Sequence, residues 1–210
     1  MDGYQPLIAE IREIIGRIAL SHSDEQLAAW ALSGPIEVDE GVDDVHFSSP
    51  SMPSGRLQSP EPHSDISTWT VDRAVLVELV LRTASARAQR WLVAEQRLLS
   101  MPENWRAVLA EVAGERFKCE VSIGLGWVDL MLAVDDWLSE LGQPATWGQI
   151  KQKFGELRAY PDSSLSDRQL DIIVYAESIL SEQLCETCGA PGRTRDRAGW
   201  YNTSCDEHTK

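Results

Sequence analysis

Residues 185–210 hold three of the four cysteines and one of the four histidines of this 210-residue chain. They read C-x2-C-x16-C-x2-H, with the four candidate ligands at Cys185, Cys188, Cys205 and His208. Two residues between the first pair let both sulfurs turn toward one ion, and Gly189 relieves the tight turn that follows. Four such ligands can close a tetrahedron around a metal. The spacing therefore predicts a structural Zn²⁺ site.

Three other roles for these cysteines fit the pattern less well. A disulfide is disfavoured in a cytoplasmic protein. A thioredoxin-like CxxC starts a helix after a strand, whereas this one follows a predicted helix and comes with two further ligands. A catalytic zinc keeps one coordination position open beside a general base, but here four protein ligands fill the site, and Glu186 and Glu207 are expected to face solvent. We therefore expect a structural site, not a catalytic one.

Nucleic-acid binding is the alternative function for this segment and for one upstream stretch. The candidate contacts are Arg193, Arg195, Arg197, Lys151 and Lys153, with Trp200 and Tyr201 beside the arginines. Basic and aromatic side chains together can contact a phosphate backbone. Three arginines are few against a formal net charge of −14. We therefore favour a solvated hairpin, with Trp200 packed beneath the zinc.

Other reactive residues are isolated in the sequence. Cys119 lies in an apolar stretch and is expected to be a buried small hydrophobe. The remaining candidates are expected at the surface, without ligand spacing: His22, His46, His63, and the pairs Asp43–Asp44 and Asp135–Asp136. No Ser-His-Asp, kinase or deaminase pattern occurs. The chain is therefore expected not to be an enzyme and to bind no small-molecule substrate.

Helical spacing of apolar residues predicts most of the elements that must position the cluster. In the N-terminal half we expect helices over residues 6–20, 24–32, 70–99 (one helix or two, with Thr70 as N-cap) and 102–114. In the C-terminal half we expect helices over residues 128–141, 147–154 and 167–184, and one strand over residues 156–160. The last helix leads directly to Cys185. The cluster itself is expected to contain a β-hairpin, with residues 199–203 as the return strand and a final helical turn.

The predicted fold class is mainly α, with a helical N-terminal region and a small α+β C-terminal domain that ends in a zinc-knuckle β-hairpin. The expected divisions are N-terminal helices at 1–33, a mobile acidic loop or linker at 34–68, a helical region at 69–115, a mainly helical domain at 116–184 and a zinc module at 185–210. Seven acidic residues and five prolines in residues 34–67 leave little that can pack. At most a short strand is expected there, around residues 36–38 or 45–47.

The charge distribution suggests what the chain binds. Residues 185–210 are neutral overall, so the preceding 184 residues carry the whole net charge of −14. Such a surface repels nucleic acid and favours a basic protein partner. The acidic loop supplies the candidate partner-binding residues Asp39, Glu40, Asp43 and Asp44. No membrane-spanning run or signal peptide is evident, so a cytoplasmic location is expected.

The C-terminal half resembles a widespread bacterial and prophage family. Four stretches carry the resemblance in order, GWVDLMLAVDDWLSEL, QIKQKFGELRAY, YAESILSEQLCETCGAPGR and GWYNTSCDEH, and they span about residues 117–208. Val128, Glu156 and Ala159 depart from the family pattern. The resemblance implies a fold and a terminal zinc module, but no reaction. Within it, Trp127 and Leu130 should anchor a helix, and three residues should pack beneath that helix: Phe154, Leu157 and Tyr160.

These features favour a protein that acts by binding another protein. A small, strongly acidic chain without a catalytic set, resembling a family of mobile elements, predicts an immunity or antitoxin-type inhibitor of a basic toxin. Acidic surfaces accelerate association with basic proteins by electrostatic steering. The alternative is a phage-derived zinc regulator associated with nucleic acid.

Overall fold

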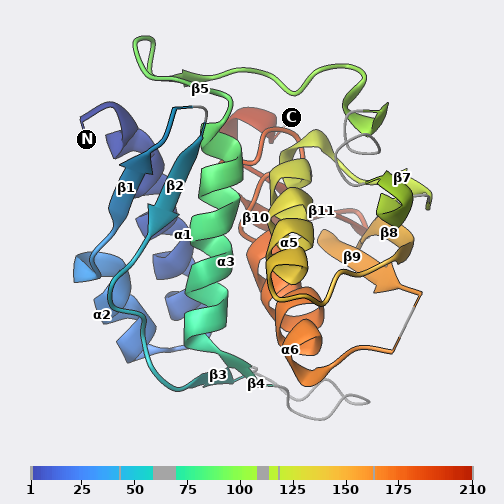
Figure 1. The fold of residues 1–210 in the computed structure, drawn as a ribbon, viewed down its shortest axis with the longest axis horizontal. Helices are drawn as coiled ribbons and strands as arrows, with labels where there is room; N and C mark the ends of the chain where they lie inside the picture. The colour runs from blue at the N-terminus through green and yellow to red at the C-terminus, as the bar shows by residue number, and fades with distance from the viewer. Residues whose placement is uncertain are drawn as a thin grey trace. The chain divides into compact units, whose positions relative to one another are not determined.

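The computed structural model describes residues 2–42, 44–58, 70–107, 114–117, 119–162 and 164–209. They fall into two compact units, Met1–Leu98 and Leu99–Lys210 (Figure 1). The model is 45% helical and 24% strand, with five small sheets in the described ranges. The predicted mainly α fold class is therefore wrong, and the fold is mixed α+β. The excess strand comes from short hairpins whose pairing partners cannot be read from helical periodicity.

The first unit is built on three helices, α1 (Gln5–Ser21), α2 (Glu25–Ser33) and α3 (Arg73–Ala88). The predicted helices over residues 6–20 and 24–32 are confirmed. Asp24 caps α2 by accepting a hydrogen bond from the Leu27 N–H at 2.8 Å. The α1 face that points inward carries Leu7, Ile11, Ile14, Ile15, Ile18 and Ala19, all buried. An apolar stripe on α1 and an apolar α3 thus form the core of this unit.

In the acidic segment the sequence predicted a loop with at most one short strand, and the structure has two paired strands there. It contains a hairpin of β1 (Glu37–Glu40) and β2 (Val45–Ser48), which lies along α3 (Figure 1). Phe47 is buried, its ring meets that of Tyr4 edge-to-face at 6.2 Å, and its N–H donates to Ser85 Oγ at 2.8 Å. One apolar side chain on β2 therefore orders a segment whose composition indicated mobility. Residues 59–68 of the predicted loop lie outside the described residues.

Two further hairpin pairings correct the prediction of a helix over residues 70–99. Thr70 is not an N-cap, because it lies in β4 (Thr70–Asp72), which pairs with β3 (Arg56–Gln58), and Asp72 caps α3 instead. After α3, β5 (Trp91–Leu92) pairs with β6 (Arg97–Leu98). Trp91 donates from its indole to the Gly3 carbonyl at 3.0 Å. This tertiary contact holds Trp91 in β5, whereas a continued helix would have placed the side chain elsewhere.

The second unit packs helices against a three-stranded sheet in the order β7–β8–β9. The strands are β7 (Val121–Ser122), β8 (Trp147–Lys153) and β9 (Glu156–Pro161), with β7 parallel and β9 antiparallel to β8. The predicted helix over 147–154 is wrong, because pairing on both sides of β8 satisfies its backbone and overrides local helix propensity. The predicted strand over 156–160 is confirmed as β9.

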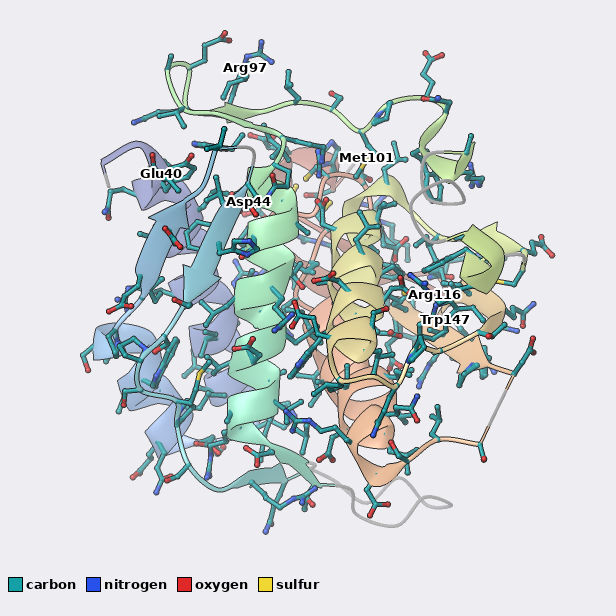
Figure 2. All side chains as sticks on the ribbon, in the orientation of Figure 1. Glu40, Asp44, Arg97, Met101, Arg116 and Trp147 are labelled. Atoms are coloured by element: carbon teal, nitrogen blue, oxygen red, sulfur yellow. The ribbon has the colours of Figure 1, made fainter. Side chains whose placement is uncertain are left out.

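Helix α5 (Val128–Glu140) confirms the prediction over 128–141, with Trp127 and Leu130 fully buried. A continuous helical stretch of α6 (Asp167–Gln169), a π-helical turn (Leu170–Ala176) and α7 (Glu177–Ser181) confirms the last predicted helix. Asp135 is not on a solvated face: it is buried and pairs with Arg116 at 2.7 Å (Arg116 is labelled in Figure 2). Residues 105–107 are helical, and the predicted helix beyond them enters residues outside the described ranges.

The chain ends in β10 (Arg193–Arg197), β11 (Trp200–Ser204) and a 3-10 turn, Asp206–His208. The hairpin and the final turn are as predicted, with β10 as the partner of the predicted return strand. None of the helices in the described ranges combines the length and the apolar character needed to cross a membrane.

Candidate metal centre

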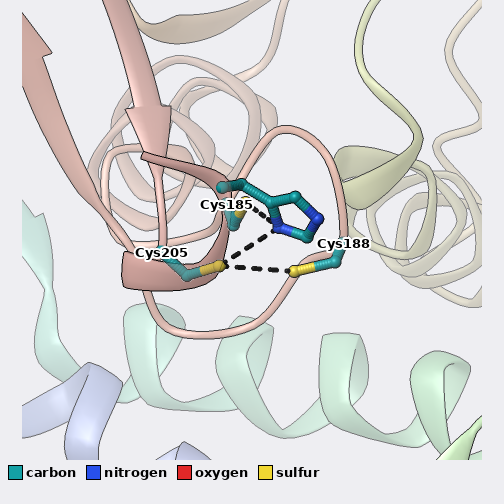
Figure 3. A group of neighbouring side chains, drawn as sticks. Cys185, Cys188 and Cys205 are labelled. Atoms are coloured by element: carbon teal, nitrogen blue, oxygen red, sulfur yellow. Dashed lines mark hydrogen bonds between the residues drawn. The ribbon is translucent and has the colours of Figure 1, made fainter. Parts of the chain in front are cut away.

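The four predicted ligands converge on one point. The ligand atoms of Cys185, Cys188, Cys205 and His208 all lie within 4.8 Å of one another (Figure 3). His208 Nδ1 is 3.6 Å from Cys185 Sγ and 3.2 Å from Cys205 Sγ, and the Cys188 and Cys205 sulfurs are 3.8 Å apart. The group could hold a metal ion, with one ligand atom from each side chain.

The distances fit tetrahedral coordination. With a metal–sulfur bond of about 2.3 Å, two sulfurs of a tetrahedral site lie about 3.8 Å apart. That is the separation between Cys188 and Cys205. His208 Nδ1 lies nearer to Cys205 than to Cys185. A bound ion would therefore require a small movement of the imidazole ring to make these two distances more equal.

The first two ligands are placed by a tight knuckle after α7. Leu184 pairs with Pro191 in an isolated bridge, the Cys185 N–H donates to the Ala190 carbonyl, and the Gly189 N–H donates to the Cys185 carbonyl, both at 2.8 Å. Gly189 has φ +73°, a conformation that favours glycine. These backbone hydrogen bonds turn both sulfurs to one side.

The last two ligands are placed by β11 and the turn that follows. The His208 N–H donates to the Cys205 carbonyl at 3.2 Å, which sets the C-x2-H spacing on one 3-10 turn. Arg195 donates to the Ser204 carbonyl at 3.4 Å and pairs with Asp206 at 2.7 Å, and Arg193 lies 3.5 Å from the same carboxylate. The arginines of β10 thus hold the turn that carries the histidine.

A glycine contact that the sequence analysis did not assign joins the knuckle to α5. A Cβ on Gly126 would lie 2.0 Å from the Cys185 carbonyl oxygen, so only glycine allows this approach. The Gly126 N–H donates to the Glu186 carbonyl at 2.8 Å, and the Trp127 indole donates to the Leu184 carbonyl at 2.9 Å. The Gly-Trp pair at the start of α5 was the available signal. Its partner could not be named without the fold.

A second contact joins the hairpin to the turn between β8 and β9. Thr203 is fully buried, donates to the Gly155 carbonyl at 2.7 Å, and its hydroxyl lies 2.9 Å from that of Thr194. A Cβ on Gly155 would lie 2.8 Å from the Thr194 methyl. The β10–β11 hairpin, which we call the metal hairpin, is therefore joined to the rest of this unit by polar contacts.

The surroundings of Cys185 favour a thiolate. The hydrogen bond from the Cys188 thiol is the largest of the effects that lower the pKa of Cys185 to about 3, against the opposing effect of burial. The backbone N–H groups of Cys205, Cys188 and Thr187 contribute in the same direction. The pKa of Cys188 moves upward, because it donates to Cys185. A metal ligand must be deprotonated, so a dication would displace the proton that the two sulfurs share.

Several expectations around this site are corrected. Trp200 does not pack beneath the cluster, since 82% of its surface is exposed. Glu207 is exposed, as expected, but Glu186 is half-buried, accepts from the Thr203 N–H at 2.8 Å and has a pKa raised by burial. Phe154 and Tyr160 are exposed and do not pack under α5, whereas Leu157 is buried.

The other candidate residues lie away from the metal ligands. Lys151 and Lys153 lie on β8, with their ammonium groups 5.3 Å from the ring centroids of Tyr160 and Phe154 respectively. Arg197 donates to the Thr209 carbonyl. Cys119 is only half-buried, and burial raises the pKa of its thiol. His22 ends α1, His46 lies on β2, and His63 is outside the described residues.

The candidate partner-binding carboxylates lie at one end of the β1–β2 hairpin. Asp39, Glu40 and Asp44 are exposed, and Asp43 lies outside the described residues. Figure 2 labels Glu40 and Asp44 where the two strands meet. Asp44 lies 3.0 Å from His46, and Glu40 raises the pKa of Tyr4 further, in addition to the larger effect of burial.

No family model matches this chain, and neither the curated proteins nor the solved structures contain a match. The metal centre therefore has to be interpreted from its own geometry.

Proposed function

We propose that the chain is a cytoplasmic protein, stabilised by a structural zinc ion, that acts by binding another protein as an immunity or antitoxin-type inhibitor of a basic toxin. Zinc is supported by the donor set: three thiols and an imidazole are the ligands of structural zinc, whereas Mg²⁺ and Ca²⁺ take oxygen. Cys185, Cys188, Cys205 and His208 would complete the coordination, so the ion would cross-link the chain and leave no position for substrate. A reducing compartment keeps such thiols available.

Metal analysis of the purified protein tests the zinc assignment. We expect one zinc per chain, lost in Cys188→Ser and retained in Cys119→Ser, since Cys119 lies outside the cluster. Stoichiometric iron in place of zinc, or zinc retained by Cys188→Ser, would refute it.

The β1–β2 hairpin is the observation that supports protein binding. It presents Glu37, Asp39, Glu40 and Asp44 from an ordered scaffold, with Val42 at the tip 99% exposed. Carboxylates on a rigid element can steer a basic partner and then dock it with little loss of conformational entropy. An ordered acidic hairpin suits recognition better than the mobile acidic loop that composition suggested.

Co-expression with the products of the genes adjacent to this chain's own gene tests the proposed activity. One of these products should arrest growth alone, and the chain should restore growth and form a complex with it. Asp39→Lys/Glu40→Lys should slow association by about tenfold and weaken its salt dependence. The control Glu103→Lys/Glu120→Lys makes the same change in net charge at exposed positions on the other unit. Absence of a toxic neighbour, or equal effects of the two double variants, would contradict the proposal.

A further inference from the structure

Phe154 occupies a turn position that its side chain disfavours. It links β8 to β9 together with Gly155, and the two residues have φ +58° and +80°. Positive φ at both central positions defines a type I′ turn, for which Asn-Gly is the favoured pair and a bulky aromatic residue is an outlier. Phe154 is nevertheless 63% exposed, so burial in the core does not offset this strain. A strained, exposed aromatic residue requires another explanation than stability.

Phe154 belongs to a continuous strip of aromatic and basic side chains, which we call the basic aromatic strip. Its members are Tyr160, Lys151, Lys153, Phe154 and Tyr201. Lys151 pairs with Arg158 across the sheet and shares a face with Lys153 and Tyr160. Each lysine lies over one ring, and Phe154 meets Tyr201 edge-to-face at 6.2 Å. The strip therefore crosses from the β8–β9 sheet onto the metal hairpin.

The strip is held rigid from below. Gln152 donates to the Tyr201 carbonyl at 2.9 Å, and Thr203 donates to Gly155 directly beneath the turn. Ordered Tyr and Phe side chains with two lysines lose little entropy on binding, and aromatic residues dominate the affinity of protein interfaces. The arrangement has the features of a preformed docking surface.

We propose that the basic aromatic strip binds an acidic protein segment that carries apolar side chains between its carboxylates. Charge complementarity supports this occupant: Lys151 and Lys153 share their sheet face with Arg158 and Glu156, which pair with each other, so the two lysines leave a local positive charge that attracts carboxylates. This surface is separate from the acidic β1–β2 hairpin, has the opposite charge, and does not depend on the proposed inhibitor function.

Single-stranded nucleic acid fits the strip less well. Stacking requires free ring faces, but the two lysines lie over the rings of Tyr160 and Phe154, and Tyr201 packs against Phe154 edge-to-face. Nearby arginines are engaged: Arg193 and Arg195 with Asp206, and Arg158 with Glu156. Two lysines can neutralise only a few phosphates.

Selection of a displayed library of random peptides against the full-length, metal-loaded protein tests the proposal. We expect enrichment of peptides that combine Asp or Glu with Trp, Phe or Leu. A selected peptide should bind at least about tenfold more weakly to Phe154→Asn and to Lys153→Glu. Phe154→Asn creates the favoured Asn-Gly turn, so its midpoint of thermal unfolding should equal or exceed that of the wild type.

Trp200→Ser is the matched control. Trp200 is more exposed than any aromatic residue of the strip, but it neighbours Tyr201 on β11 and so points to the opposite face. Peptide affinity should be unchanged in this variant. The proposal is overturned if enriched peptides lack acidic residues, if Phe154→Asn binds them as tightly as the wild type, or if Trp200→Ser weakens binding equally. It is also overturned if an oligo-dT strand binds more tightly than any selected peptide, or if the wild type sediments as a dimer and Phe154→Asn as a monomer.

Discussion

The two hairpins β1–β2 and β10–β11 are of similar size but are stabilised in different ways. On β2, Phe47 is buried against the helical core and its backbone is fixed by Ser85. On β10–β11, the buried side chains are Thr203 and Ser204, which are both polar, and the strands continue into Cys205 and His208. An isolated two-stranded hairpin is only marginally stable in water. One hairpin therefore depends on an apolar anchor, and the other on metal ligands and buried hydroxyls.

This difference shows how a short polar segment can be ordered without a core of its own. β10 and β11 read RTRDR and WYNTS, and their two large aromatic side chains, Trp200 and Tyr201, are exposed, so these strands bury little apolar area. A bound ion concentrates stabilisation at four side chains, and its binding energy becomes folding energy. Where one large apolar side chain is present, as on β2, hydrophobic burial is sufficient.

Removing the metal should produce the largest difference in stability between the two hairpins. Cys185→Ser, or chelation of the wild-type protein, should destabilise β10–β11 and the knuckle by more than about 4 kcal/mol, because the ligands then lose their common partner. Amide hydrogen exchange should rise across residues 185–209 and stay unchanged in β1–β2. Cys119→Ser should leave both hairpins protected. Equal protection of β10–β11 with and without metal would show that its hydrogen bonds are sufficient.

The converse variant, Phe47→Ala, should open the other hairpin. Removing a buried phenylalanine costs about 3 kcal/mol or more through lost burial and the cavity left behind. Exchange should rise in residues 37–40 and 45–48, with no change in β10–β11. The control Val42→Ala, at a position that is almost fully exposed, should alter stability by less than about 0.5 kcal/mol. If Val42→Ala opened the hairpin as far, Phe47 would not be its anchor.

The smallest expected effect is a pH dependence of the free energy of unfolding that arises from Glu182, at the end of α7. Burial, then the negative charge and hydrogen bond of Glu156, raise the pKa of Glu182 from 4.5 to about 7. The folded form thus prefers the protonated acid, so this stability is fully present below about pH 4.5 and is lost as pH rises through about 7. Burial also raises the pKa of Glu177, so this carboxyl contributes to the pH dependence with the same sign.

Chemical denaturation between pH 5 and 8 measures this term. The wild type should lose on the order of 2 kcal/mol relative to Glu182→Gln across that range. If Glu182→Gln had the same pH profile as the wild type, the carboxyl would be ionised in the folded protein at neutral pH.

Sequence reasoning succeeded where the signal was local. The four ligands form two pairs, and the two residues of each pair are three positions apart on one turn. The predicted clustering of Cys185, Cys188, Cys205 and His208 is confirmed. The apolar stripe of α1 and the helix after Trp127 were equally readable, since a helix places every third or fourth residue on one face. The contact of Gly126 with the knuckle was not predicted, because Cys185 lies far along the chain from Gly126.

Sequence reasoning failed where backbone partners are distant. Lys151 and Lys153 lie in a stretch with reasonable helix propensity, yet pairing with β7 and β9 makes it a strand. Trp91 leaves the predicted helix because its indole finds the Gly3 carbonyl, 88 residues away. Asp135 looked solvated beside Asp136, but Arg116 pairs with it in the interior.

The sequence by itself determined the ligand set of the metal centre, the main amphipathic helices and the acidic character of the chain, because each depends on residue type and spacing within a few turns. Only the tertiary structure decided which segments became strands, that the acidic segment is an ordered hairpin, and that Phe154 and Tyr201 meet on one surface. Those outcomes depend on hydrogen-bond partners and buried neighbours supplied by remote parts of the chain, and local propensities of a fraction of a kcal/mol per residue are too weak to oppose them.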